Sequence, residues 1–175
     1  MVVPRFFSIF VFFLFTIVLT AQEGWMVAVG PTVAPANSLT GGNFRAYLGT
    51  SPTFCFGPEI SVFPYQTTTE EYETSLFEVN LNAHYVFELA HRFGVYPLSG
   101  LNYTNENERS LMHSDEIEKH NALGINYGVG AHYSINRVLL FAEFKGIISE
   151  LSDEFFTIGA VIVLKKPEKK AHHEQ

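Results

Sequence analysis

Apolar and polar residues alternate one by one through much of the chain. The segment from Phe77 to Leu89 has an apolar or aromatic residue at every odd position and a polar residue at most even positions. The segment from Leu123 to Ile135 repeats this pattern, with glycine, asparagine, histidine and serine between the apolar residues. A period of two places successive side chains on opposite faces of a β-strand, whereas helical spacing would mix asparagine and glutamate into the apolar stripe. Both segments are therefore predicted strands with one apolar face.

Six further segments show weaker forms of the alternation, which gives eight predicted strands in all. The six cover residues 25–30, 44–48, 56–62, 93–103, 138–148 and 155–165. The connections between strands alternate in length. They are short at 50–53, 90–92 and 136–137, and long or acidic at 35–42, 66–73, 105–119 and 150–154. Hairpins that run up and down, with the long connections at one end, predict an up-and-down β-barrel.

Alternation alone does not distinguish a soluble barrel, whose apolar residues point inward, from a membrane barrel, whose apolar residues face lipid. The polar faces are rich in glycine, serine and asparagine, which would leave holes in a soluble core but make room for larger polar side chains in a narrow lumen. The apolar faces carry large aromatic residues near strand ends, as the interfacial girdles of membrane barrels do. These are Trp25, Phe77, Phe87, Tyr133 and Phe156. We therefore predict an all-β, eight-stranded antiparallel up-and-down transmembrane β-barrel over residues 22–165.

The N-terminal residues are typical of a targeting segment. Arg5 precedes an apolar run from Phe6 to Leu19, and the small residue Ala21 follows. This order is that of a secretory signal peptide. A helix of this length would be about 21 Å long, short of the roughly 30 Å hydrocarbon core, so a cleaved signal is favoured over a permanent anchor. We expect a signal peptide at 1–21, cleavage after Ala21, and a basic, polar periplasmic tail at 166–175.

Two segments add a family resemblance to this pattern. They are Gly-Val-Gly-Ala-His-Tyr at 128–133 and the final alternating run from Phe155 to Leu164. With the signal peptide and the eight strands, they resemble the small outer-membrane β-barrel domains of Gram-negative bacteria, the OmpA-type family. The resemblance covers nearly the whole mature chain and implies a stand-alone outer-membrane barrel, inserted by the barrel-insertion machinery among outer-membrane lipid and lipopolysaccharide. One departure is that the chain continues to Gln175, whereas many such barrels end on an aromatic residue.

Polar and charged residues on the inward faces form the main candidate site. Buried charges need partners of opposite charge, and here basic and acidic residues come from neighbouring strands. We expect a salt-bridged, hydrogen-bonded network that fixes the barrel rather than an ion path, because eight strands leave little room for one. The network comprises Arg45, Glu59, Glu78, Asn80, Asn82, His84, Glu88, Asn126, His132, Glu143 and Lys145.

The composition and the motifs argue against several classes of partner and of chemistry. The chain has 175 residues, a formal net charge of −7 and one cysteine, so neither a nucleic-acid partner nor a disulfide framework is expected. No Gly-x-Ser-x-Gly elbow occurs beside His84 or His132, and we predict no catalytic residues and no enzyme. His172, His173 and Glu174 are not expected to form a metal site, and no metal or cofactor is predicted. Cys55 is expected to be a packed thiol.

The long connections hold more than half of the chain's 18 carboxylates. We expect these to keep the exposed loops solvated, with bridging through divalent cations to lipopolysaccharide phosphates as the alternative. The longest loop, 105–119, is the expected contact for a surface partner. The predicted function is a non-catalytic structural or surface-interaction protein of the outer membrane. The alternatives are a secreted lipocalin-like binder of a small ligand, whose apolar faces would point inward, and a lipid-modifying outer-membrane enzyme.

Overall fold

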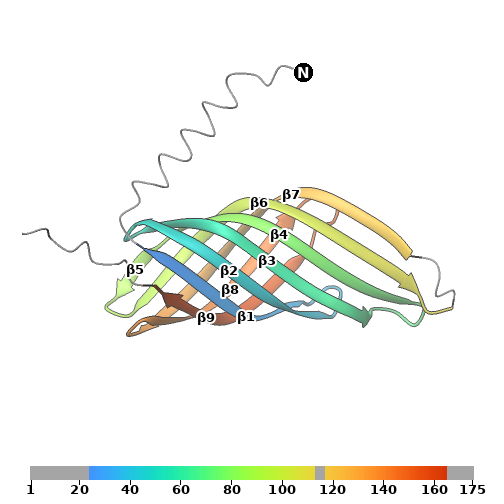
Figure 1. Cartoon of the computed structure of the whole chain (residues 1–175), viewed down its shortest axis with the longest axis horizontal. Helices are drawn as coiled ribbons and strands as arrows, with labels where there is room; N and C mark the ends of the chain where they lie inside the picture. The colour runs from blue at the N-terminus through green and yellow to red at the C-terminus, as the bar shows by residue number, and fades with distance from the viewer. Residues whose placement is uncertain (1–23, 113–116, 165–175) are drawn as a thin grey trace, which may run out of the picture.

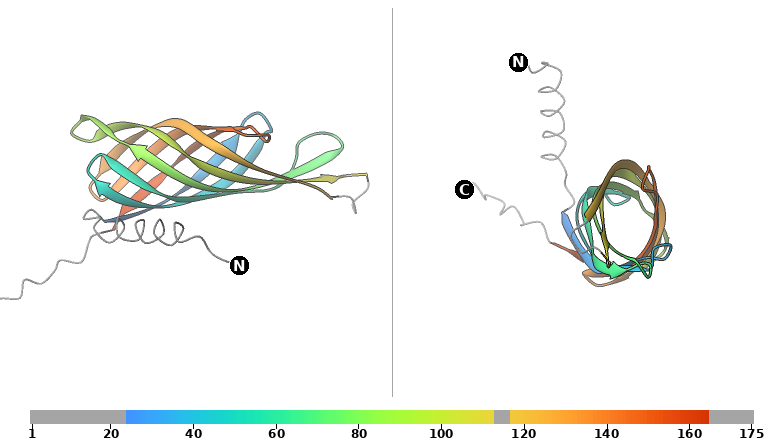
Figure 2. Two further views of the ribbon diagram at one scale, coloured as in Figure 1. Left: turned by 90° about the horizontal axis from the view of Figure 1, so that it is seen from above. Right: turned by 90° about the vertical axis from the view of Figure 1, so that its right-hand side faces the viewer.

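The computed structural model describes residues 24–112 and 117–164. They form a single antiparallel sheet that closes on itself, because β1 pairs with both β2 and β9 (Figure 2). The strands are β1 (Trp25–Ala34), β2 (Leu39–Ser51), β3 (Phe54–Thr67), β4 (Tyr72–Tyr85), β5 (Phe87–Ala90), β6 (Phe93–Ser110), β7 (Ile117–Ile135), β8 (Val138–Ile148) and β9 (Glu154–Val163). β4 and β5 both pair with β6 and act as one barrel strand, so the nine segments make an eight-stranded barrel. The predicted antiparallel up-and-down topology is confirmed.

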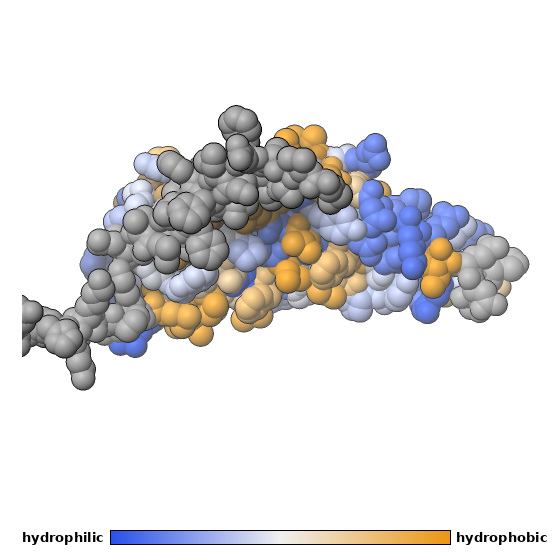
Figure 3. Space-filling view, turned by 45° about the horizontal axis from the view of Figure 1, so that its top comes forward, coloured by the Kyte–Doolittle hydropathy of each residue, from blue (hydrophilic) through white to orange (hydrophobic). Residues whose placement is uncertain are grey.

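The alternation along each strand separates an apolar exterior from a polar interior. Val129 is 61% exposed and Leu101 is 64% exposed, whereas Glu78 and Asn126 between such residues are fully buried. Figure 3 shows hydrophobic residues around the middle of the barrel and hydrophilic residues toward one end. The lipocalin-like alternative required the apolar faces to point inward, and it is wrong. This distribution is the one that a transmembrane barrel needs.

The two ends of the barrel differ. At the terminal end, where β1 begins after Gly24 and β9 leads to Leu164, the strands are joined by tight turns. At the distal end, β6 and β7 extend far beyond the end of β8, and β4 accompanies β6 as far as the pair Tyr72 and Ser110 (Figure 1). The predicted signal peptide, its cleavage after Ala21 and the tail at 166–175 lie outside the described residues. Among the residues that are described, no helix is long and apolar enough to cross a membrane.

The predicted strand from Phe77 to Leu89 is interrupted at Val86. β3 pairs with β4 as far as Phe54 and Tyr85, and then turns away. The Val86 N–H donates to the Thr53 carbonyl in this turn, at 2.7 Å. β5 therefore continues the strand with only β6 as its neighbour.

The predicted loop at 105–119 is largely a paired hairpin, and the prediction of a loop is wrong there. The register between β6 and β7 continues without a break to Arg109 and Ile117. β4 supports this hairpin as far as the pair Tyr72 and Ser110, but β8 pairs with β7 only from Ile125 onward. In this segment both faces of the strands carry polar residues, so the sequence shows no apolar face by which the strands could be recognised. We call residues 105–110 and 117–121 the hairpin extension.

Candidate functional site: the lumen and the hairpin extension

Arg45 lies at the centre of the lumen, where it contacts two carboxylates from different strands. Its Nη1 lies 2.7 Å from Glu143 Oε2, and its Nε lies 3.3 Å from Glu59 Oε2. The guanidinium carbon also lies 4.6 Å from the centre of the Phe141 ring. All three charged side chains are at most 2% exposed. The predicted pairing between strands thus exists at the position where a lone charge would be most costly.

Lys145 forms a second centre, one level toward the distal end. Its Nζ lies 2.8 Å from Glu59 Oε1 and 3.4 Å from Glu78 Oε2. Glu59 therefore bridges the two cations, with one oxygen toward each. Lys145 is also 5.1 Å from the ring centre of Phe155. The two centres form one connected network across β2, β3, β4 and β8.

Asparagine side chains lie beside these charges, on β4, β6 and β7. Asn126 Nδ2 donates to the side-chain oxygens of Asn80 and Asn82 at 2.9 and 2.8 Å. Asn82 Nδ2 in turn donates to Glu59 Oε2 at 3.1 Å, and Asn102 Nδ2 donates to Asn80 Oδ1 at 2.8 Å. Asn102 was not among the predicted residues, although it lies on the same face of β6. These hydrogen bonds link β3, β4, β6 and β7 and so fix the relative positions of the strands, although Asn126 Oδ1 itself has no partner.

Toward the terminal end, the network gives way to a stack of rings. His84 lies between Tyr47 and Tyr96, with ring centres 4.6 and 4.9 Å away, and His132 lies next to Tyr96. Tyr96 occupies space that glycine leaves open, because a Cβ on Gly130 would lie 2.3 Å from the ring carbon Cζ. The expectation that lumen glycines make room for larger side chains is confirmed here.

Glu88 is the one predicted network residue that is not buried. Its side chain is 55% exposed on β5, and it reaches His132 Nε2 at 3.4 Å. Because β5 extends past the end of β3, Glu88 lies at the mouth of the barrel rather than in its interior. Neither histidine of the lumen pairs with a serine, since His132 contacts Glu88 and His84 Nε2 has no hydrogen-bond partner.

The distal third of the lumen holds an apolar plug that the sequence analysis missed. Phe63 and Phe155 lie at its centre, with ring centres 5.6 Å apart and each 1% exposed. Its members are Ala34, Leu39, Phe63, Leu76, Ile147 and Phe155. They belong to inward positions near the distal turns, so strand phase could have located them. The lumen is thus filled in three layers: an apolar plug, a charged network and a ring stack.

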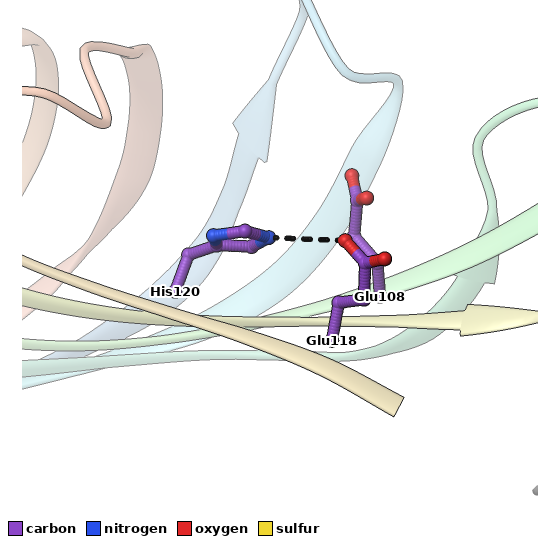
Figure 4. Close-up of side chains that lie close together, drawn as sticks. All are labelled: Glu108, Glu118 and His120. Atoms are coloured by element: carbon purple, nitrogen blue, oxygen red, sulfur yellow. Dashed lines mark ion pairs between the residues drawn. The ribbon is translucent and has the colours of Figure 1, made fainter. Parts of the chain in front are cut away.

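The hairpin extension brings together a second group of polar side chains. Glu108 and Glu118 are directly opposite each other on β6 and β7, and Glu106 is opposite His120. His120 Nε2 lies 3.7 Å from Glu118 Oε2 (Figure 4). The ligand atoms of Glu108, Glu118 and His120 all lie within 4.8 Å of one another. Carboxylates and imidazole are ligand types that Zn²⁺ accepts, but Glu118 and His120 are largely exposed to water.

Two carboxyl groups of the distal end have raised pKa values, one in the hairpin extension and one in the β8–β9 turn. Partial burial raises the pKa of Glu106 above its usual value, and the neighbouring Glu108 carboxylate raises it further. Burial likewise raises the pKa of Asp153, against the opposing hydrogen bonds from the Glu154 N–H and Asn37. Both groups line a hollow of about 230 Å³ above the apolar plug. The distal mouth is therefore acidic and only partly solvated.

No protein-family model matches the chain, and no curated protein matches it. Solved structures do match. The outer membrane protein OprG of Pseudomonas aeruginosa superposes with a TM-score of 0.64 at 10% identity, over 84% of this chain and 99% of that one. The chain has the fold of the small outer-membrane β-barrels.

Two other structures with the small outer-membrane barrel fold match over their whole length. The N-terminal β-barrel domain of Pseudomonas aeruginosa OprF superposes with a TM-score of 0.61 at 16% identity, over 82% of this chain. Ail, the attachment invasion locus protein of Yersinia pestis, superposes with a TM-score of 0.59 at 12% identity, also over 82% of this chain. At such low identity the shared feature is the small outer-membrane barrel fold itself.

Proposed function

We propose that this chain is a non-catalytic barrel protein of the outer membrane, which closes its own lumen and presents the hairpin extension as an interaction surface. The observation that carries the proposal is the inversion of polarity, with a paired charge network inside and an apolar exterior. Such an exterior is stable only against lipid. The similarity to outer-membrane barrels from Pseudomonas and Yersinia supports the location.

The proposal includes the route to the membrane and the orientation there. The signal peptide at 1–21 exports the chain and is cleaved after Ala21, and the barrel-insertion machinery assembles it. The terminal end, with its tight turns, then faces the periplasm together with the tail at 166–175, and the distal end faces outward. Outer-membrane barrels generally have short periplasmic turns and longer outer loops, which supports this orientation.

The hairpin extension is the proposed interaction surface because it projects beyond the apolar exterior and carries unbalanced charge. Glu106, Glu108 and Glu118 share one face with His120. The opposite face is better balanced, since Arg109 pairs with Glu73 and lies over the Tyr65 ring. Divalent cations held by the acidic face would bridge it to lipopolysaccharide phosphates. Ail is named as an attachment protein, which supports a surface role for a barrel of this shape.

Envelope fractionation, a detergent gel with and without boiling, and planar-bilayer conductance test the first half of the proposal. We expect the protein in the outer-membrane fraction, a band that shifts on heating, and no steady conductance because paired charges and the apolar plug fill the lumen. A soluble periplasmic or secreted protein would contradict the location. A stable conductance of the wild-type barrel would contradict the closed lumen.

A shortened hairpin tests the second half. Joining Glu106 to His120 through an Asn-Gly turn removes 107–119 and keeps a directly opposed pair as the last rung. We expect this variant to insert and shift on heating as the wild type does, but to lose Ca²⁺-dependent co-sedimentation with lipopolysaccharide aggregates. The matched control keeps the full hairpin and carries Lys119→Gln on the other face. Equal, Ca²⁺-dependent co-sedimentation of the wild type and the shortened variant would contradict a role for the extension.

A further inference from the structure

The lumen opens at the terminal end into a cavity that the charge network does not occupy. The cavity has a volume of about 340 Å³ and lies between the ring stack and the barrel mouth. Its walls come from strands at both ends of the chain, including β1, β2, β8 and β9. Its volume falls within the range of small-molecule sites, which is roughly 300–1,000 Å³. The apolar plug lies at the opposite end, so this cavity is a pocket with one mouth.

Most of the cavity wall is apolar. Leu139 and Phe141 of β8 line one side, and Val161 and Val163 of β9 lie next to them. Met26 of β1 continues this wall. These inward positions are apolar, as those of the distal plug are, whereas the charged network between them is polar. An aqueous vestibule would not need such a wall, whereas an apolar ligand would be stabilised by it.

The inner end of the cavity is polar and incompletely paired. Arg45 and His84 both line it and are 2% and 5% exposed. Arg45 Nη2 and His84 Nε2 have no hydrogen-bond partner. Buried polar nitrogens without partners are rare and costly, so a ligand oxygen that accepts from Arg45 Nη2, and from His84 when the imidazole proton is on Nε2, would be stabilising. The two groups therefore favour a ligand with a polar atom at its inner end.

The charged residues around the inner end of the cavity determine whether an anionic or a neutral polar group of a ligand is favoured there. Three buried carboxylates, Glu59, Glu78 and Glu143, outnumber the two buried cations Arg45 and Lys145. Glu88 adds a further carboxyl group at the mouth, opposite His132. An anionic head group would increase this excess of negative charge in a poorly solvated space. A neutral carbonyl or hydroxyl oxygen accepts the same hydrogen bonds without that cost.

We propose that the terminal cavity is a binding site for a small uncharged molecule with an apolar body and one carbonyl or hydroxyl oxygen. The oxygen points inward to Arg45 and His84, and the body lies against Leu139, Phe141 and Val161. The site goes beyond the proposed surface role, because it uses the other end of the barrel. It also does not depend on the hairpin extension.

Cys55 gives a direct readout of occupancy, because it lines the cavity and is the chain's only cysteine. The mature full-length protein in phospholipid nanodiscs is treated with methyl methanethiosulfonate, and modification of Cys55 is followed by mass spectrometry. Benzylacetone, an uncharged ketone, is the test ligand, and hydrocinnamate is its anionic isostere. We expect benzylacetone to slow the reaction several-fold and saturably, and hydrocinnamate to have little effect at the same concentration.

Three results would overturn the site as proposed. Benzylacetone that leaves the rate unchanged means that the cavity does not bind it. Equal protection by hydrocinnamate means that the inner end does not select a neutral oxygen. A thiol that reacts in the unfolded chain but not in the folded barrel, even in alkaline buffer in which the thiolate is populated, means that the mouth is closed to ligands.

Filling the cavity tests the location with a matched pair of variants. Leu139 faces the cavity and its neighbour Leu140 faces outward, where it is 48% exposed. We expect Leu139→Trp to raise the half-protecting concentration of benzylacetone about tenfold or more, and Leu140→Trp to leave it unchanged. The heat shift on a gel verifies assembly of both. If Leu139→Trp does not assemble, Val161→Phe with the outward control Ile162→Phe gives the same comparison. Unchanged protection in an assembled cavity-filling variant would overturn the proposal.

His84→Phe tests the inner end separately. Phenylalanine keeps a ring between Tyr47 and Tyr96 but removes the unpaired nitrogen. We expect weaker protection by benzylacetone, by several-fold, with an unchanged reaction rate in the absence of ligand. Protection equal to that of the wild type would overturn the assignment of His84 as a ligand contact.

Discussion

The lumen and the hairpin extension place carboxylates close together in two different ways. In the lumen, Glu59 and Glu78 lie on adjacent strands with Lys145 between them, and all three are at most 3% exposed. In the extension, Glu108 lies directly opposite Glu118, with Glu106 and His120 as the next pair on the same face. Water and salt screen the exposed pair but not the buried one. Burial therefore decides whether close carboxylates need a cation.

β7 shows the same contrast along one strand. Val129 faces outward near the middle of the barrel, and Ile117 is on the same face in the extension. Between them, the strand leaves the apolar exterior and β8 ceases to be its neighbour. The same substitution at the two ends of this strand should therefore have different effects on the stability and membrane insertion of the barrel.

The largest expected effect is the loss of the buried cation. Lys145→Met leaves Glu59 and Glu78 buried without their partner, and we expect a loss of about 3–5 kcal/mol in the free energy of unfolding. Urea unfolding in detergent micelles, followed by the gel shift, measures it. Lys119→Met makes the same chemical change in the extension and should cost less than about 0.5 kcal/mol. Equal effects of the two substitutions would mean that the lumen is as solvated as the extension.

The next largest effect concerns the outward face. Val129→Arg places a charge against lipid and should cost roughly 2–4 kcal/mol near the midplane. Ile117→Arg on the same face should have almost no effect on insertion, because it lies beyond the apolar exterior. The heat-shifted fraction in the outer membrane reports both. Normal assembly of Val129→Arg would show that this face does not contact lipid.

The sequence predicted the barrel because the membrane requires an apolar face on each strand. Where strands cross the apolar region, as at Leu123 to Ile135, the alternation of apolar and polar residues is visible in the sequence and the topology follows. Beyond that region the requirement ends. From Asn105 onward both faces of the strand carry polar residues, so the sequence pattern predicts a loop there although the backbone pairing of the hairpin extension is complete.

The candidate lumen residues were predictable for the same reason, but their partners were not. The phase of each strand identifies Arg45 and Glu143 as inward-facing. Which strands lie across the lumen depends on closure and stagger, which the alternation does not contain. The apolar plug around Phe63 was not predicted because the alternation indicates polar residues at inward positions, whereas those near the distal turns are apolar. The group formed by Glu118 and His120 with Glu108 required the register of the hairpin extension.

A smaller effect is expected from reversing one charge in the extension. Glu118→Lys converts a like-charged pair with Glu108 into an opposite pair, and we expect a gain of about 0.2–1 kcal/mol in local stability. Hydrogen exchange of the β6 and β7 amides measures this gain, which should diminish at high salt. Lys119→Glu on the opposite face provides the control. Faster exchange in Glu118→Lys would show that the carboxylates of this pair do not repel each other.

The smallest expected effect is a dependence of the local stability of the distal end on pH. The pKa values of Glu106 and Asp153 are raised in the folded protein, so the folded state binds more protons than the unfolded state in the window between the usual and the raised pKa values. Stability is therefore favoured below this window and falls as the pH rises through it. We expect slower hydrogen exchange near Glu106 and Asp153 in mild acid, after correction for intrinsic rates. Glu106→Gln should weaken this dependence, and an unchanged profile would count against the cause given.

The central claim is that the apolar exterior of this barrel contacts lipid. Trp25 tests it directly, because it is the chain's only tryptophan and is 52% exposed at the start of β1, near the terminal rim. Its fluorescence is measured in bilayers that contain brominated lipids. We predict strong quenching by bromines placed near the head groups, weaker quenching by bromines near the chain ends, and little quenching by aqueous iodide. Efficient quenching by iodide with none by either brominated lipid would contradict the claim.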